Sequence, residues 1–308
     1  MTSTEPRRWT VHALMLCCAF LVSTSFTVGK AIAADLDPAY ITFLRFLMAV
    51  LLFLPIVYRQ QGLKIPPVRS LLGYSLISGT LVGFFYLMFL SLRYTTALHT
   101  GVIYTLVPSI SGLYSAIILR EHLGITRIAA IFPAMFGATW VVFKGHPLDI
   151  LTLHLNQGDL IFLGGCLIMA LYTPLIRLFH KGETMAVMTF WILVCGCGWL
   201  LLLTGHNILT FPWQNISVKV LLGIAYLAIF TTIITFFINQ WATLYLGPTR
   251  VMAYSYLYPP LIAGIDWSLG HGLPSAQTML GILFIVPAMF ILQKGNVTYK
   301  ETTHRGDE

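Results

Sequence analysis

Apolar stretches about 20 residues long, the length of a helix that crosses a membrane, recur along this whole chain. Such a helix covers roughly 30 Å of hydrocarbon. The stretches are continuous and do not alternate between apolar and polar residues, which argues against a transmembrane barrel. We therefore predict ten membrane-spanning helices, at residues 11–34, 38–58, 70–92, 96–118, 125–143, 157–178, 184–204, 218–244, 249–269 and 275–293.

The composition leaves little room for a soluble domain. Of the 308 residues, 9% are charged, whereas about 25% are charged in an ordinary globular domain. The sequence has no phosphate-binding Gly-x-x-x-x-Gly-Lys-Ser/Thr loop, and Cys195-Gly-Cys197 has no nearby His or acidic residue. We expect no ATP hydrolysis by that route, no metal, no cofactor and no enzymatic activity.

Basic residues are concentrated in alternate connections between the predicted spans. The connections on the other side hold only Arg93, Lys144 and Lys219. By the positive-inside rule, this predicts a multi-pass protein of the cytoplasmic (inner) membrane with both termini in the cytoplasm. The net charge of +7 is then a topology signal. It indicates a lipid bilayer as partner and no nucleic acid.

The two halves of the sequence resemble each other. Ser91 to Pro108 aligns without gaps with Ala242 to Pro259. The other matches are Thr42-Phe43 with Thr189-Phe190, Lys30 with Arg177, and Lys144-Gly145 with Lys294-Gly295. Each match is weak alone, and the colinear order over about 150 residues is what indicates a repeat.

Each repeat contains five predicted spans. An odd number of spans reverses the direction of the chain across the bilayer, so the two repeats are predicted to be inverted. We expect an all-α membrane protein in which two inverted five-helix repeats, residues 1–152 and 153–308, surround a central cavity, with a short cytoplasmic tail. Inverted repeats are a recurrent construction of secondary transporters.

Several motifs carry a resemblance to a known family. Asp37-Pro38 begins the second span with Arg45 inside it, Pro108 in the fourth span is followed by Arg120-Glu121-His122-Leu123, and the ninth span contains Pro259. In these features the chain resembles the EamA-type transporters of the drug/metabolite transporter (DMT) superfamily, over residues 11–295. The resemblance implies a ten-helix basket that transports, often exports, amino acids or related metabolites.

The chain departs from that family at two places. Members often carry a Trp in the first span, where this chain has Ser23-Thr24-Ser25, and the second half lacks a Glu that matches Glu121. The resemblance implies that the Ser23-Thr24 position approaches the central cavity, so the first departure leaves the substrate open.

Cavity residues are expected among inward-facing polar and aromatic side chains. Gly101, Tyr104, Pro108, Ser111 and Ser115 share one face of the fourth span, although small residues also serve helix packing. The Tyr104 hydroxyl needs a partner at that depth, and its ring can stack on an apolar substrate. The resemblance implies an aromatic cavity. The predicted substrate-binding residues are Tyr86, Tyr104, Tyr172, Ser23, Thr24, Phe237 and Tyr258.

Pro108 and Pro259 coincide in the repeat alignment near the middle of their spans. Each removes a backbone hydrogen bond, and an opened turn at the midplane is where transporter sites are usually found. Proline kinks also occur in inert membrane helices. Both interpretations, functional hinge and inert kink, remain open at this point.

Charged groups within spans are functional hypotheses by default. Lys30, Arg45 and Asp266 are predicted to lie near the outer surface, with His99 close by. They form either a structural ion-pair cluster or an outer gate that docks a substrate carboxylate. Proton coupling is a further hypothesis, with Asp266 as the first carrier and His99 as the second, because His titrates near physiological pH.

The function predicted from the sequence is a secondary transporter that moves a small metabolite, an amino acid or related amphipathic compound, by alternating access, with export as the favoured direction. One alternative is an integral-membrane enzyme that acts on lipid or a lipid-linked substrate, since His154 and Asp159 have the spacing of glycerolipid acyltransferases. Another is a structural or sensory membrane protein. The sequence does not specify substrate, energy coupling or oligomeric state.

Overall fold

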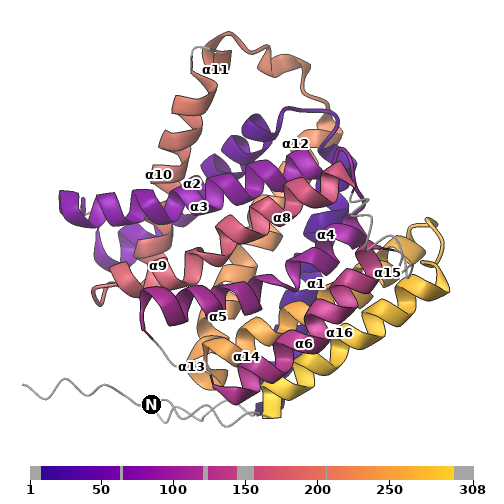
Figure 1. Cartoon of the computed structure of the whole chain (residues 1–308). Coiled ribbons are helices and arrows are strands. Elements are labelled where there is room, and N and C mark those ends of the chain that lie inside the picture. Colours follow the sequence, from indigo (N-terminus) through magenta and orange to yellow (C-terminus); the bar gives the residue numbers. More distant parts are fainter. Residues whose placement is uncertain (1–7, 63–64, 121–123, 144–155, 206, 295–308) are drawn as a thin grey trace, which may run out of the picture.

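The computed structural model describes residues 8–62, 65–120, 124–143, 156–205 and 207–294, and within those ranges it contains helices and no strands (Figure 1). The N-terminal half holds α1 (Arg8–Ile32), α2 (Pro38–Gln61), α3 (Val68–Ser91), α4 (Ala97–Tyr104), α5 (Val107–Ile118) and α6 (Ile125–Val142). The C-terminal half holds α8 (Gln157–Ala170), α9 (Tyr172–Phe179), α10 (Met185–Thr204), α11 (Asn207–Thr210), η1 (Trp213–Asn215), α12 (Val218–Ala228), η2 (Ile229–Ile234), α13 (Thr235–Leu246), α14 (Pro248–Ala253), η3 (Tyr254–Leu257), α15 (Tyr258–Ser268) and α16 (Ala276–Lys294).

The helices have the length and composition of membrane spans. Among the described residues, eight helical stretches are long and apolar enough to cross a membrane, and Ala129–Val142 is a shorter apolar helix. The ninth predicted span, 249–269, consists of two short helices, α14 and α15, joined by η3. This protein is therefore an all-helical, multi-pass membrane protein.

Polar residues at the helix starts explain where several spans begin. The Asp37 carboxylate accepts a hydrogen bond from the Ala39 amide at 2.8 Å, and Pro38 occupies the first helical position, where its missing N–H costs nothing. Asn156 caps α8 in the same way. These caps fix the ends of the apolar stretches to within a few residues of the predicted limits.

Four spans are interrupted rather than continuous. Pro108 and Pro259 each occupy one of the first two positions of a new helix, α5 and α15, because a proline cannot donate a hydrogen bond to the preceding turn. The sixth predicted span breaks at Leu171, between α8 and α9, and the eighth contains the π-helical segment η2. The predicted opening of the fourth and ninth spans is confirmed, whereas the other two interruptions were not predicted.

The two halves pack against each other through several helix pairs. Helix α3 packs on α8, and α1 packs on α12 and α13; α2 packs on α10, α4 on α15, and α6 on α16. Figure 1 shows α6 and α16 side by side. Their contact needs glycine, since a Cβ added to Gly137 would lie 2.6 Å from the Gly281 carbonyl oxygen.

Successive spans run in opposite directions, so the bundle has two ends. We call the end at which α1 begins and α16 ends the terminal end. The opposite end holds the start of α2, α4 and α8 and the end of α15. The core between them is formed by buried aliphatic and aromatic side chains, among which Phe26, Phe46, Phe53, Phe89 and Phe162 are at most 1% exposed.

Candidate functional site

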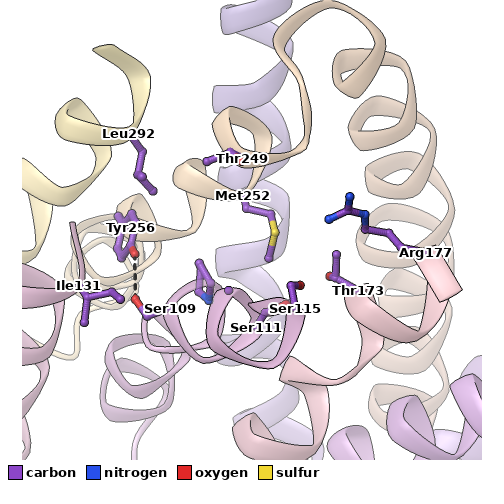
Figure 2. Close-up of a pocket in the computed structure, with 12 residues that line it drawn as sticks. Ser109, Ser111, Ser115, Ile131, Thr173, Arg177, Thr249, Met252, Tyr256 and Leu292 are labelled. Carbon is purple, nitrogen blue, oxygen red and sulfur yellow. Dashed lines mark hydrogen bonds between the residues drawn. The ribbon is translucent and has the colours of Figure 1, made fainter. Parts of the chain in front are cut away.

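A cavity opens between α5, α9 and α14 at the terminal end of the bundle (Figure 2). Its water-accessible part measures about 70 Å³, enough for several water molecules. The residues that line it are Pro108, Ser109, Ser111, Gly112, Ser115, Ile131, Thr173, Arg177, Thr249, Met252, Tyr256 and Leu292. They come from both halves of the sequence, so the cavity lies between the halves.

The cavity wall is rich in hydroxyl groups. Ser111 and Ser115 follow Pro108 along one face of α5, and Thr173 and Thr249 lie on α9 and α14. The one charged residue in the described lining is Arg177 near the end of α9, and Figure 2 shows its side chain directed toward the α14 side of the cavity. The lining therefore offers both apolar surface and hydrogen-bonding groups, which suits an amphipathic solute.

An aromatic cluster lies beyond the cavity, toward the opposite end. It consists of Phe26, Phe84, Tyr104, Phe162 and Tyr258, whose ring centroids are 5.6–6.2 Å from their neighbours. Tyr104 ends α4 and Tyr258 begins α15, so both flank a helix interruption. Along the fourth and ninth spans, the helix interruptions therefore lie between the cavity and the aromatic cluster.

The hydroxyl groups of Tyr104 and Tyr258 are not engaged by the protein. Both side chains are partly exposed, and neither hydroxyl forms a hydrogen bond within the described chain. By contrast, the Tyr256 hydroxyl, which lines the cavity, lies 3.5 Å from the Ser109 hydroxyl. Two such hydroxyl groups in the aromatic cluster can bind a polar group of a ligand, while the rings stack on its apolar part.

The opposite end is closed by hydrogen bonds. Buried Asp159, in the first turn of α8, accepts from Thr95 and pairs with His99 Nδ1 at 3.0 Å. Arg93 donates to the carbonyl oxygens of Ala33 and Leu36 at 2.8 and 2.9 Å. These bonds join α3, α4 and α8 to the end of α1. A second, open hollow at this end lies between the α1–α2 connection and the segment before α12, where Leu36, Phe211 and Val220 line it.

The model of the EamA-like transporter family matches this sequence in two segments, residues 9–143 and 156–293. The chain belongs to the EamA-like transporter family. The two matched segments fall on either side of the boundary between the two predicted repeats.

Similar proteins are also transporters by name. An uncharacterized transporter of Bacillus subtilis, YyaM, is 24% identical over 90% of this chain and 91% of its own length. An uncharacterized transporter of Archaeoglobus fulgidus is also 24% identical, over 91% of this chain and 96% of its own. A solved crystal structure that is 20% identical superposes with a TM-score of 0.64 and covers 93% of this chain and 98% of the other, which shows a shared fold.

In the structure of this EamA-family protein, the predicted substrate-binding residues lie in separate groups. Tyr104 and Tyr258 belong to the aromatic cluster, whereas Tyr86, Tyr172 and Phe237 pack on a second core around Phe46 and Phe53. Phe237 stacks on Phe53 at 5.5 Å. None of these aromatic residues is among those that line the cavity, so their role as substrate contacts stays a prediction.

The first-span positions are tied into the helix bundle. The Ser23 hydroxyl is fully buried and donates to the Ala19 carbonyl at 2.7 Å. The Thr24 hydroxyl bonds the Leu21 carbonyl and the Tyr226 hydroxyl, at 2.6 and 2.7 Å. Neither residue lines the cavity.

The predicted charged residues are not joined in one ion-pair cluster. Lys30 donates to the Leu92 carbonyl at 2.6 Å, and Asp266 accepts from Thr27 at 3.2 Å, with His271 at 3.9 Å. Arg45 contacts Thr231 and Thr232. His99 pairs with Asp159, a buried residue in the first turn of α8. His154, the other residue of that motif, lies outside the described residues.

The fourth-span stripe has two roles. Pro108, Ser111 and Ser115 line the cavity, as the sequence suggested. Gly101 serves helix packing, because a Cβ added there would lie 2.1 Å from Cδ1 of Ile262. Sequence reasoning missed the lining residues Thr173 and Thr249, although Arg177 had a signal, since it matches Lys30 in the repeat.

Proposed function

We propose that this EamA-family protein is a secondary transporter that carries a small amphipathic metabolite, such as an amino acid or related compound, across the cytoplasmic membrane. The carrying observation is a cavity with many hydroxyl groups between the two halves, open at the terminal end and followed by an aromatic cluster, while hydrogen bonds of Asp159 join α4 to α8 at the opposite end. This is the arrangement expected of one state of an alternating-access cycle.

The proposed architecture has ten spans. They form two inverted five-helix repeats, residues 1–152 and 153–308. Two observations support it. The family model matches two consecutive segments, and the helix pairs α3 with α8 and α1 with α12 and α13 exchange roles when the halves are exchanged. The interruptions at Pro108 and Pro259 then serve as hinges at equivalent positions of the two repeats.

With both termini in the cytoplasm, the cavity faces the cytoplasm and receives substrate from it. That orientation fits export. We propose Tyr104, Tyr258 and Tyr172 as substrate contacts at the end of this path, with Tyr86 next to them, and Lys30, His99 and Asp266 as residues of the outer closure. Ser23 and Thr24 act through the packing of α1. Proton coupling is proposed for Asp266, which is partly buried and bonded to Thr27.

The membrane-enzyme alternative is less well supported. The family and the transporter names of its relatives favour transport. In addition, the Asp159 carboxylate of the acyltransferase-like pair is occupied by Thr95 and His99.

Transport can be tested by export of labelled compounds. Inside-out membrane vesicles with this protein should accumulate at least one member of a panel of labelled amino acids and their N-acetyl or deaminated analogues. Met252→Trp, which fills the cavity, should abolish accumulation, while Met252→Leu, which conserves volume, should retain it. Equal accumulation by vesicles with wild type, Met252→Trp and no protein would contradict the proposal.

A further inference from the structure

Arg45 is a charged side chain enclosed within the helix bundle. It lies on α2, seven residues after the helix begins at Pro38, which places it about 10 Å inside that end. The residue is 2% exposed. A charge at such a position costs several kcal/mol unless an opposite charge or a full set of hydrogen bonds compensates for it.

The protein supplies only neutral partners for this guanidinium. Nε donates to the Thr232 hydroxyl at 3.0 Å, and Nη2 donates to the Thr231 hydroxyl at 3.2 Å. The Phe85 ring stacks on the group, with its centroid 4.2 Å from Cζ. Nη1 is buried without an acceptor. Within the described chain, no carboxylate pairs with Arg45.

The threonine pair is positioned by the π-helical segment η2. Both hydroxyl groups donate to the Leu227 carbonyl, at 2.9 and 3.0 Å, which leaves their oxygen atoms free to accept from Arg45. Widened turns of this kind are found frequently at functional sites. Two consecutive hydroxyls therefore hold two nitrogens of the guanidinium, and the third nitrogen remains available.

The repeat shows that the fold does not require a charge at this position. In the register that matches Thr42-Phe43 with Thr189-Phe190, the counterpart of Arg45 is Ile192. Ile192 is fully buried. The same structural position is therefore filled by an apolar side chain in the other half, so the guanidinium of Arg45 serves something other than helix packing.

Arg45 also borders the aromatic cluster. The Phe85 ring that covers it lies 5.1 Å from the ring of Phe84, and Phe84 lies 5.7 Å from Tyr104. Phe85 is partly exposed. A ligand whose apolar body packs in the cluster can therefore present a charged end to Arg45 once Phe85 changes rotamer.

We propose that Arg45 binds the carboxylate of the transported substrate, and that the substrate class is small carboxylates with an apolar or aromatic body. This inference rests on the proposed transport function. A carboxylate supplies the missing negative charge and the acceptor for Nη1, and guanidinium is the side-chain group best matched to it. The Thr231 and Thr232 hydroxyls are positioning groups that hold the guanidinium in place.

Paired ligands test this assignment on the purified, detergent-solubilised full chain. The probes are phenylacetate, 3-phenylpropionate and L-phenylalanine, each compared with its primary amide at equal ionic strength. A ligand that binds the folded state raises the apparent melting temperature. At least one acid should raise it, and the matching amide, which has the same shape without the charge, should not.

Three variants locate the effect. Arg45→Gln should abolish the response to the acid, and Arg45→Lys, which keeps the charge but loses the planar fork, should weaken binding by about tenfold. Arg59→Gln is the matched control, because Arg59 is an exposed residue in the last turn of the same helix and its loss should leave the response unchanged. Equal responses to acids and amides, no response to any acid, or an unchanged affinity in Arg45→Lys overturns the assignment.

Transport of the same probes separates this inference from the function on which it depends. If the acid binds through Arg45 but is not accumulated by vesicles, the carboxylate site stands and the transport proposal fails. If a neutral compound is transported equally by wild type and Arg45→Gln, transport stands and the carboxylate site falls.

Discussion

The two ends of this bundle differ in the residues that the proposed repeats place at equivalent positions. In the register that matches Lys30 with Arg177, buried Asp159 corresponds to His12, and in the register of the Ser91 to Pro108 block, His99 corresponds to Arg250. The opposite end thus joins a carboxylate to a histidine at 3.0 Å. The terminal end has two basic residues at the same positions.

The same two registers relate the residues that line the cavity to residues near the opposite end that do not line it. Cavity-lining Arg177, Ser115 and Thr249 correspond to Lys30, Asp266 and Leu98. Lys30 and Asp266 are engaged in hydrogen bonds, and Leu98 is 9% exposed within the core. In the proposed transport cycle, the two ends are equivalent parts in two different states, and the Asp159 carboxylate favours closure of the opposite end.

The largest effect is expected when the closing carboxylate is neutralised. Asp159→Asn leaves the Thr95 and His99 donors poorly paired in a buried place, at a cost of about 2 kcal/mol, or roughly 30-fold in the balance between the two states. A cysteine in place of Leu98, in a chain without native cysteines, reports opening by its alkylation rate. The rate should rise by tens of fold in Asp159→Asn.

Asp35→Asn is the control for that experiment, since the Asp35–Lys219 pair is at the same end but exposed, with side chains 42% and 63% accessible. Exposed pairs contribute at most about 1 kcal/mol. An equal rise in both variants would remove the special role of Asp159.

A smaller effect is expected from placing a carboxylate at the terminal end. His12→Asp places a carboxylate at the position that corresponds to Asp159 in the proposed repeats, and it should favour closure of the cavity. The free energy gained in favour of the closed state is limited to about 1 kcal/mol, or roughly fivefold in the balance of states, because the His12–Tyr254 hydrogen bond is lost. Alkylation of a cysteine in place of Thr249 should slow by this factor, and His12→Asn, which adds no charge, should not slow it.

The smallest effect concerns a contact at the terminal end that is independent of the cavity. Tyr74 donates to the Glu183 carboxylate at 2.7 Å. Partial burial alone would raise the pKa of Glu183, but this bond, backbone hydrogen bonds and nearby His180 together lower the pKa below its usual 4.5. A lowered pKa stabilises the fold above the unfolded-state pKa, and that stability is lost as pH falls through the folded-state value.

Tyr74→Phe should therefore cost about 1 kcal/mol of folding free energy near neutral pH. The difference in melting temperature from wild type should shrink below pH 4.5. A difference that is constant from neutral pH to acid would show that the carboxylate charge does not contribute to the bond.

Much of the helical framework could be predicted, because the signals for it are local. Asp37-Pro38 marks the start of α2, and Pro108 and Pro259 mark two of the interruptions. The break at Leu171 had a local signal as well, since Pro174 cannot donate to the Ala170 carbonyl, but that proline was passed over. The π-helical turn has no proline and no comparable signal.

The site was predicted less well, since its contacts join residues far apart in the chain. Arg45 was expected in an ion-pair cluster or an outer gate but contacts Thr232. Asp159 was considered only as part of an acyltransferase-like spacing, whereas in the structure it pairs with His99. Depth along a span can be counted from the sequence. Rotation about the helix axis and the identity of the facing helix cannot, and these decide which side chains meet.

Alkylation of one repeat-equivalent pair from each side of the membrane tests the central claim most directly. Cysteines in place of Thr249 and Leu98, in a chain without native cysteines, are treated with an impermeant maleimide in inside-out and right-side-out vesicles. The account predicts that the cysteine at 249 reacts from the cytoplasmic face alone. The cysteine at 98 should react slowly in the otherwise wild-type chain. In Asp159→Asn it should react faster, and from the outer face alone. Reaction of the cysteine at 249 from the outer face, or of the cysteine at 98 from the cytoplasmic face, would contradict an alternating-access protein whose cavity faces the cytoplasm.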